Sequence, residues 1–467
     1  MRPTTLYHTA NRYVILSILV VFSMTGCSLR KHCVDPQVTL PEQIIDTIAS
    51  DSMSLADLHW SEIFADTLLQ SLVQQTLTYN KDLLAAAARM QELEKLHRVA
   101  KADFFPSLNA EAHIDYETTR HTNSTPANDL EVAAVGTLSW EVDFFGRVRW
   151  ANREALAKYL ASVEGQRALQ MTLVAEVVTA YVELMALDNE LRIITRTVET
   201  RKEDRDKAKL RFEGGLTSEI PYQQAEVEYA STAALIPDLQ RKIESKENHI
   251  ALLTGQMPMA IERSDIRTYQ KNQVELAVGF PSDLLKRRPD MRAEEQNLKA
   301  AMARAGIAWA DRFPRFTINL QGGLENDAFR GFLAAPWTYM IGELTSPIFS
   351  FGKRKARYNA AVKAYDAQRF QYEKKVLQVF QEVNNAVVGY SSANEKVVLM
   401  QNLYDAASKY VDLAMFQHIN GHISYMDVLD AQRSFLNAEI DLSNAIRDQY
   451  IAMITLYKSL GGGWQDE

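Results

Sequence analysis

Two long tracts without proline, each carrying an apolar heptad pattern, constrain the fold of this 467-residue chain most strongly. No proline occurs between Pro126 and Pro221, and none follows Pro347. In the first tract, apolar residues are spaced alternately four and three apart: Leu173, Val177, Ala180, Leu184, Leu187, Leu191, Ile194 and Val198. This spacing predicts long helices that pack side by side, knobs into holes.

The same pattern recurs later in the chain. In the second tract it comprises Tyr372, Val376, Val379, Val383, Ala386 and Tyr390. Phe145-Gly146-Arg147 precedes Phe351-Gly352-Lys353 by 206 residues, and Gly215 precedes Gly421 by the same interval. A shared interval at separate landmarks predicts an internal duplication.

Each copy is predicted to contain a helix, a β-hairpin, a very long helix, a glycine turn and another long helix. We assign the parts as follows: residues 61–256 to the first copy, 257–287 to a connecting equatorial segment, 288–460 to the second copy, and 461–467 to a C-terminal tail. The long helix that starts at Arg147 would be about 100 Å long at ~1.5 Å per residue. Pro237 should kink or end the helix after the first turn, since proline cannot donate to the helical ladder.

The segments 106–144 and 314–350 change to a period of two, which is typical of β-strands. Two interpretations remain open: an amphipathic sheet in a soluble protein, or a transmembrane barrel with one face to lipid and a polar lumen. Strands of about ten residues suit a tilted bilayer span and favour the barrel. Two hairpins supply four strands, whereas barrels start at about eight, so a membrane barrel would need several chains.

The N-terminus has the features of an export signal. Residues 1–26 carry two cationic and no acidic side chains, with an apolar run at 13–22 that is too short to cross the ~30 Å hydrocarbon layer. Met24-Thr25-Gly26-Cys27 resembles a bacterial lipobox, so Cys27 is expected to carry an acyl anchor at the start of an N-terminal segment, 27–60. An ordinary signal peptide with an incidental cysteine is the alternative.

Two further expectations concern this region and the membrane. Ser28 after the lipobox cysteine indicates sorting to the outer membrane, and Cys33 is interpreted as a spare thiol. Outside the signal, no stretch is expected to be long and apolar enough for a transmembrane helix.

Composition and motifs exclude several classes of protein. The chain has 51 basic and 59 acidic residues and no basic block, so it lacks the stripe of basic residues that is typical of a nucleic-acid-binding protein. Two cysteines near the N-terminus exclude a disulfide scaffold and a CxxC-type zinc site. No Gly-rich phosphate loop, HExxH or GxSxG motif occurs, so we expect no enzyme, no catalytic residues and no cofactor.

Two alternatives compete with these expectations. His418 and His422 have the i,i+4 spacing of metal ligands, but Ile419-Asn420-Gly421 between them predicts a turn, so we expect solvated histidines and no metal site. A purely structural coiled-coil protein would explain the heptads but not the signal, the lipobox or the hairpins.

The order of the landmarks is similar to that of TolC-type outer membrane factors. The motifs that carry the resemblance are Trp140-Glu141-x-Asp143-x-Phe145-Gly146-Arg147, Arg287-Arg288-Pro289-Asp290 and Val428-Leu429-Asp430-Ala431-Gln432-Arg433. The lipobox and the terminal Leu460-Gly461-Gly462-Gly463-Trp464 resemble the lipoprotein branch of OprM and NodT. The resemblance covers the chain from about residue 55 to Trp464.

The resemblance implies a mainly α fold with membrane β-structure. A duplicated helix–β-hairpin–helix unit would form a homotrimer, whose twelve-stranded barrel in the outer membrane is continuous with a periplasmic α-helical tunnel. It implies the channel-tunnel of a tripartite efflux or export system. The implied partners are outer membrane lipid, a periplasmic adaptor and an inner-membrane pump of the RND type.

The glycine turns are the first candidate site. They lie near 213–218 and 418–424, where glycine supplies the positive φ of a helix end and a serine or threonine caps the next helix. By resemblance these turns are periplasmic tips that contact the adaptor; the residues concerned are Gly214, Gly215, Ser218, Gly421 and Ser424. The alternative is that they merely reverse the chain.

Asp427 and Asp430 form the second candidate site. Three residues apart, they lie on one side of the helix after the second tip. TolC-type proteins carry acidic residues at this part of the motif, so in a trimer each would form a ring of three carboxylates at a periplasmic gate. Such rings attract cations and repel anions. Asp430 is the better candidate, because Asp427 could instead cap the helix.

Overall fold

The computed structural model describes residues 33–37, 58–119, 127–266, 285–327, 330–346 and 349–464. The predicted signal peptide, Cys27 and most of the predicted connecting segment lie outside these residues. The chain divides into two compact units, each of which draws on both copies of the repeat. Unit 1 comprises Met1–Val38, Arg89–Val163 and Ala293–Lys375, and unit 2 comprises Thr39–Ala88, Glu164–Arg292 and Val376–Glu467.

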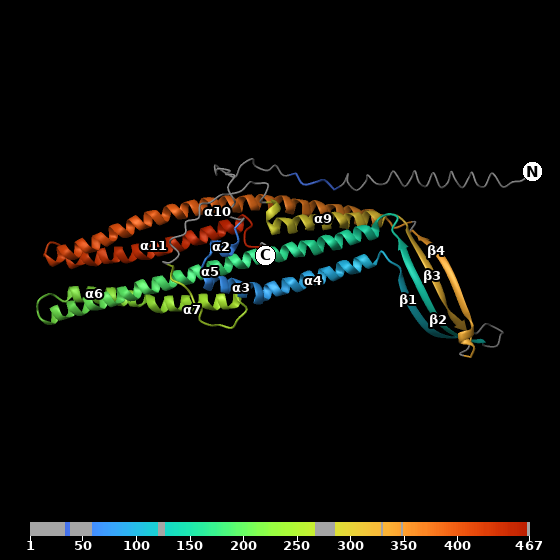
Figure 1. The fold of residues 1–467 in the computed structure, drawn as a ribbon, viewed down its shortest axis with the longest axis horizontal. Coiled ribbons are helices and arrows are strands. Elements are labelled where there is room, and N and C mark those ends of the chain that lie inside the picture. Colours follow the sequence, from blue (N-terminus) through green and yellow to red (C-terminus); the bar gives the residue numbers. More distant parts are fainter. Residues whose placement is uncertain are drawn as a thin grey trace, which may run out of the picture. The chain divides into compact units, whose positions relative to one another are not determined.

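Unit 1 contains one antiparallel sheet in the order β1-β2-β3-β4 (Figure 1). The first hairpin is β1 (Ser107–Thr119) and β2 (Ala127–Val142). The second is β3 (Arg315–Asn326) and β4 (Pro336–Thr345), with the short 3-10 helix η3 (Phe332–Ala334) between them. Because β2 pairs with β3, the two copies of the repeat are joined through the middle of the sheet.

The strand register gathers apolar side chains on one face of the sheet. One row across the four strands consists of Leu108, Leu138, Leu320 and Met340. The neighbouring row, which points to the other face, consists of Asn109, Thr137, Gln321 and Tyr339. Leu108 is 76% exposed and Met340 is 70% exposed, so the described residues leave the apolar face uncovered.

The duplication is visible in the bounds of the helices. α5 (Arg147–Glu213) and α10 (Lys353–Ile419) each have 67 residues, and α4 (Lys81–Ala102) and α9 (Pro289–Ala310) each have 22. At ~1.5 Å per residue, α5 and α10 are each about 100 Å long. The predicted fold class, mainly helical with a smaller β component built from a duplicated unit, is confirmed.

Unit 2 is helical. Beside parts of α5 and α10 it contains the following helices: α2 (Trp60–Ile63), α3 (Thr67–Tyr79), α6 (Ile220–Ala233), α7 (Leu235–Leu253) and α11 (Tyr425–Ser459). Leu173, Val177 and Leu184 of the first heptad pattern are buried in one core together with Val383 and Ala386 of the second. The two heptad patterns therefore pack into a common core.

Proline makes the two copies differ after their turns. α6 ends at Ala233 and α7 begins at Leu235, so Pro237 lies in the first turn of α7, where its missing N–H has no helical partner to lose. α11 contains no proline and runs unbroken for 35 residues. The interruption predicted near Pro237 is confirmed.

One expectation about membrane helices is wrong. Among the described residues, α5 contains an 18-residue window with a mean hydropathy of 1.3, which is long and apolar enough to cross a membrane. Of that window, 61% is buried inside the protein. A core helix has these properties, because its apolar stripe packs against other helices.

Two helical glycines yield a matched stability prediction. A Cβ added at Gly306 would lie 2.3 Å from the Trp150 ring, whereas one added at Gly389 meets nothing within 4 Å. Gly306→Ala should lower the free energy of unfolding by about 1–3 kcal/mol through overpacking. Gly389→Ala should raise it by about 0.5–1 kcal/mol, since alanine favours the helix. Chemical denaturation followed by circular dichroism measures both, and equal shifts would contradict the prediction.

Candidate functional site

The two tips have the same backbone geometry. Gly215 and Gly421 have φ values of 71° and 74°. The amide of Leu216 donates to the Arg211 carbonyl at 2.9 Å, and the equivalent amide of His422 donates to the Gln417 carbonyl at 2.9 Å. These bonds define a Schellman motif, which satisfies the last carbonyls of α5 and α10. The left-handed glycines predicted at both turns are confirmed.

The tips differ in how the next helix begins. Ser424 is the N-cap of α11 and forms a capping box with Asp427. At the first tip the N-cap of α6 is Glu219, without a side-chain cap bond, so the prediction that a serine or threonine of this turn caps the helix is wrong. A cap side chain accepts from the amide two or three residues on, and the residue three positions after Ser218 is Pro221, which has no amide hydrogen.

Large apolar side chains are exposed at both tips. At the first tip Leu216 is 78% exposed and Ile220 is 65% exposed. At the second, Ile419 is 78% exposed and Phe416 is 66% exposed. A Cβ at Gly215 or Gly421 would meet nothing within 4 Å. Apolar groups left in solvent at a helix turn are typical of a contact surface.

The two acidic residues after the second tip have different environments. The Asp427 carboxylate accepts from the Ser424 amide at 2.9 Å and from the Ser424 hydroxyl at 2.7 Å. These hydrogen bonds lower the pKa of Asp427. Asp427 thus takes part in the capping box of α11 as its N3 residue, which agrees with the capping role that the sequence left open for it. Asp430, which is exposed, lies about one turn further along α11.

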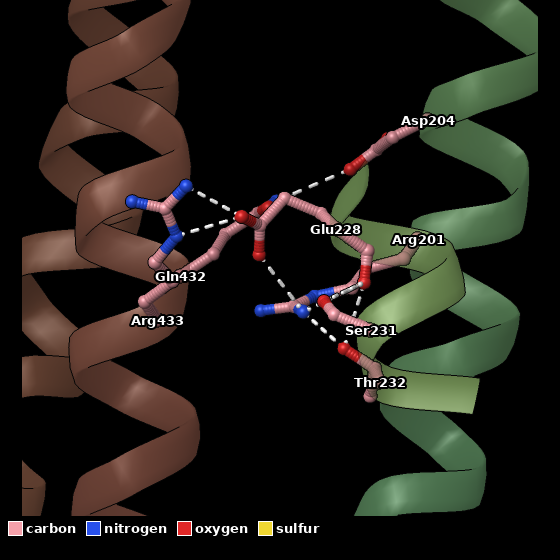
Figure 2. A network of polar contacts seen from close by, with 7 residues as sticks. All are labelled: Arg201, Asp204, Glu228, Ser231, Thr232, Gln432 and Arg433. Atoms are coloured by element: carbon pink, nitrogen blue, oxygen red, sulfur yellow. Dashed lines mark hydrogen bonds and ion pairs between the residues drawn. The ribbon is translucent and has the colours of Figure 1, made fainter. Parts of the chain in front are cut away.

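A buried ion pair close to the tips was not anticipated from the sequence. Figure 2 shows the Glu228 carboxylate of α6 between two arginines. The Arg201 guanidinium of α5 lies 2.9 Å from one carboxylate oxygen, and Arg433 Nε of α11 donates to the other at 2.8 Å. Arg201 and Glu228 are each 6% exposed, and burial lowers the pKa of Arg201.

Further contacts tie α11 to α5. The Gln432 amide donates to the Asp204 carboxylate at 3.1 Å (Figure 2). Arg196 pairs with Glu439 at 2.5 Å, and Asn189 donates to the Ser443 hydroxyl at 2.7 Å. The helix that carries Asp430 is therefore held to the first copy by a ladder of polar contacts. Arg433 belongs to a recognisable motif, but its partner lies 205 residues away, where no local pattern points to it.

The two histidines near the second tip, His418 and His422, have different surroundings. His418 Nδ1 is 3.1 Å from the Ile423 carbonyl oxygen, and its ring lies beside Tyr425. His422 is exposed in the turn itself. Within the described ranges, no group of three histidine, cysteine, aspartate or glutamate side chains is arranged to hold a metal ion.

The serines at the two tips yield a matched prediction. Ser424→Ala removes the cap of α11 and should destabilise the second tip by about 1 kcal/mol. Ser218→Ala should change the stability of the first tip by only a few tenths of a kcal/mol, because Ser218 caps no helix. Hydrogen exchange of the amides in the first turn of α6 and of α11 measures both, and equal acceleration would contradict the assignment.

Comparison with known proteins agrees with this geometry. Residues 72–256 and 280–462 match the family model of the outer membrane efflux protein. The chain is 29% identical to the toluene efflux pump outer membrane protein TtgC of Pseudomonas putida, over 97% of this chain and 96% of that one. It is 27% identical to the cation efflux system protein CusC of Escherichia coli O157:H7, over 97% of this chain and 99% of that one.

Solved structures show the same fold. The outer-membrane channel OprN superposes with a TM-score of 0.84 at 29% identity, covering 93% of this chain and all of that one. The open state of the Neisseria gonorrhoeae MtrE outer membrane channel superposes with a TM-score of 0.84 at 26% identity. The superposition covers 92% of this chain and 97% of that one. The chain therefore belongs to the outer membrane efflux protein family.

Proposed function

We propose that three copies of this chain form the outer membrane channel-tunnel of a tripartite efflux or export system. The barrel crosses the outer membrane and the long helices extend as a tunnel through the periplasm. A periplasmic adaptor and an inner-membrane pump of the RND type deliver the cargo. The named relatives handle cargo as different as toluene and cations, so the proposal assigns the route and not the compound.

The sheet is the observation that carries this proposal. Among the described strands, β1 and β4 each have only one neighbour, so the sheet has two open edges, and its apolar face is exposed. An open edge cannot lie in lipid, because its N–H and C=O groups would find no partner. Three copies of four strands supply the twelve strands that close a barrel.

The long helices and the N-terminus fit this arrangement. α5 and α10, each about 100 Å long, are suited to span a compartment, not to fill a globular core. Within the proposal, Cys27 carries an acyl anchor and the repeats keep the bounds 61–256 and 288–460. Extraction from membranes as ring-shaped trimers tests the assembly, which neither an enzyme nor a purely structural coiled coil would form.

The tips are proposed to contact the adaptor. The contact would use both turns. The residues concerned are Gly214, Gly215 and Ser218 at the first tip, and Gly421 and Ser424 at the second tip. Support comes from the matching Schellman turns and the exposed apolar side chains beside them. A Cβ added at Gly215 or Gly421 would meet open space, so both positions are free to lie against the proposed partner.

Bulky substitution at the tips tests this contact. Gly215→Leu or Gly421→Leu should abolish export while trimers still form, because a β-carbon strains the positive φ and the side chain obstructs the docking surface. Gly421→Asn should retain more export, since asparagine tolerates the left-handed conformation. Dye accumulation in cells and crosslinked co-purification of the adaptor measure the effect. Normal export in both leucine variants would contradict the proposal.

Asp430 is proposed to form the periplasmic gate. In a trimer its three exposed carboxylates would face one another where the α11 helices converge. Mutual repulsion disfavours full ionisation of such a ring, so protons, divalent cations or basic neighbours help to keep it closed. Asp427 would add a second ring of charge, although its oxygens already accept from Ser424.

Single-channel recording in a planar bilayer tests the gate. Asp430→Asn should raise conductance and weaken both cation preference and divalent block, since it removes three charges from the narrowest ring. Asp427→Asn should change conductance less and should loosen the start of α11. Unchanged currents in the Asp427→Ala, Asp430→Ala double variant would rule the gate out.

A further inference from the structure

Two aromatic side chains are exposed immediately before α10 in unit 1. Phe349 is 73% exposed and Phe351 is 91% exposed, and their rings meet edge to face with centroids 4.4 Å apart. Among the described residues other than glycine, Phe351 alone has a positive φ, of 46°. The left-handed region is unfavourable for a bulky residue, and such strain is typical of functional positions. A strained backbone thus presents an aromatic ring to the surroundings.

Four basic residues follow this pair within the first five positions of α10: Lys353, Arg354, Lys355 and Arg357. In the described part of the chain, none of their side chains has a hydrogen bond or an ion pair. Lys353 and Arg357 are four residues apart, so they lie on one side of the helix, where like charges repel. The first turn contains no acidic residue, and the positive N-terminus of a helix disfavours cations. α10 therefore begins with positive charge that the described residues do not neutralise.

The first copy of the repeat neutralises its equivalent cations. The residues 206 positions before the first and third cations of α10 form two ion pairs with acids near the end of β2: Arg147–Glu141 at 2.7 Å and Arg149–Asp143 at 3.1 Å. At the positions of these two acids the second copy has Pro347 and Phe349. The surplus of positive charge is therefore a property of the second copy and not of the repeated fold.

The exposed ring of Phe351 is also specific to the second copy. The equivalent Phe145 stacks on Phe313 with ring centroids 4.6 Å apart, and its φ is not positive. The glycines that follow are alike, since Gly146 and Gly352 have φ values of 80° and 78°. The glycine turn thus does not force the ring outward, and the strain at Phe351 needs another reason.

The aromatic pair continues the apolar face of the sheet. Leu344, five residues before Phe349, lies in one row with Phe316 on that face and is 66% exposed. The Phe316 ring meets that of Phe144 with centroids 5.6 Å apart. In the proposed barrel this end of the face lies at the boundary of the lipid, where barrels carry aromatic rings. Cations at this depth meet the phosphate groups of the lipid.

We propose that the start of α10 is a binding site for the headgroup of an acidic phospholipid. Lys353, Arg354 and Arg357, which lie within about 100° of one another around the helix, hold the phosphate. The rings of Phe349 and Phe351 lie against the glycerol and the first acyl carbons. These rings favour a lipid over a free phosphate, because only the lipid has a chain for them to contact. The inference rests on the proposed outer membrane position of the sheet.

Native mass spectrometry of the full-length trimer, titrated with lipid in detergent, tests the charges. The wild type should bind dioleoyl phosphatidylglycerol about tenfold more tightly than dioleoyl phosphatidylcholine, and Lys353→Gln with Arg357→Gln should remove this preference. Lys374→Gln with Lys409→Gln, which removes two exposed cations from the same helix, should keep it. The headgroup site is overturned if the wild type binds both lipids equally or if the two double variants behave alike.

Replacement of Phe351 by glycine tests the aromatic contact. Because glycine adopts a positive φ freely, Phe351→Gly should not lower the Tm, whereas it should weaken binding of phosphatidylglycerol by about threefold or more. Phe145→Gly, which removes a stacked ring, should lower the Tm and leave lipid binding unchanged. A lower Tm with unchanged lipid binding in Phe351→Gly would mean that the ring packs against protein and would overturn the lipid contact.

A soluble competitor distinguishes the two sources of phosphate. Glycerol 3-phosphate in tenfold excess over the lipid should not displace phosphatidylglycerol, since it has no acyl chain. Displacement would assign a site for a soluble phosphate ester and overturn the lipid site.

Ring-shaped trimers separate failure of this inference from failure of the proposed function. Trimers that show no preference for phosphatidylglycerol overturn the headgroup site and leave the channel proposal intact. Absence of trimers from membrane extracts overturns the channel proposal, and the headgroup site falls with it.

Discussion

Backbone hydrogen bonding in lipid is the constraint on which the rest of this structure depends. An N–H or C=O group in the hydrocarbon layer has no water to bond, so each membrane strand must be paired on both sides. The single chain supplies four strands in one sheet, joined in the middle by the pairing of β2 with β3. Its two outer strands lack a second neighbour within the described residues, and in the proposed trimer further copies of the chain would meet that need.

The duplication explains why the same chain can also build a tunnel. Each copy continues from its hairpin into a 67-residue helix, and each of these helices ends in a Schellman turn of the same geometry. Beyond the turns the symmetry is broken. One copy returns as two helices that meet at Ala234, and the other returns as the unbroken α11. The acidic candidates Asp427 and Asp430 lie only on the unbroken helix, so the two copies share their architecture but differ in the residues that follow their turns.

Glu228 holds the two copies together near their tips. Its buried carboxylate balances Arg201, which is also buried, and it reaches Arg433 on the helix of the other copy. Breaking such a pair by removing one partner typically costs about 3–5 kcal/mol, because the remaining charge is left without compensation. Movement of α11 against α5 and α6 must therefore exchange these contacts for others, which ties the position of Asp430 to the packing of the first copy.

Local patterns in the amino-acid sequence were enough to predict the element types, the interval of the duplication, both glycine turns and the interruption near Pro237. Periodicity and backbone preference act within a few residues, so they can be recognised without a partner. The same reasoning failed at Ser218, because the next helix has Glu219 as its N-cap and Pro221 in its first turn, and it missed the pairing of Glu228 with Arg433. It also missed the burial of Cys33 against Leu298 and Tyr365. These features depend on which surfaces of distant segments meet, and that is decided only when the helices pack and the strands pair.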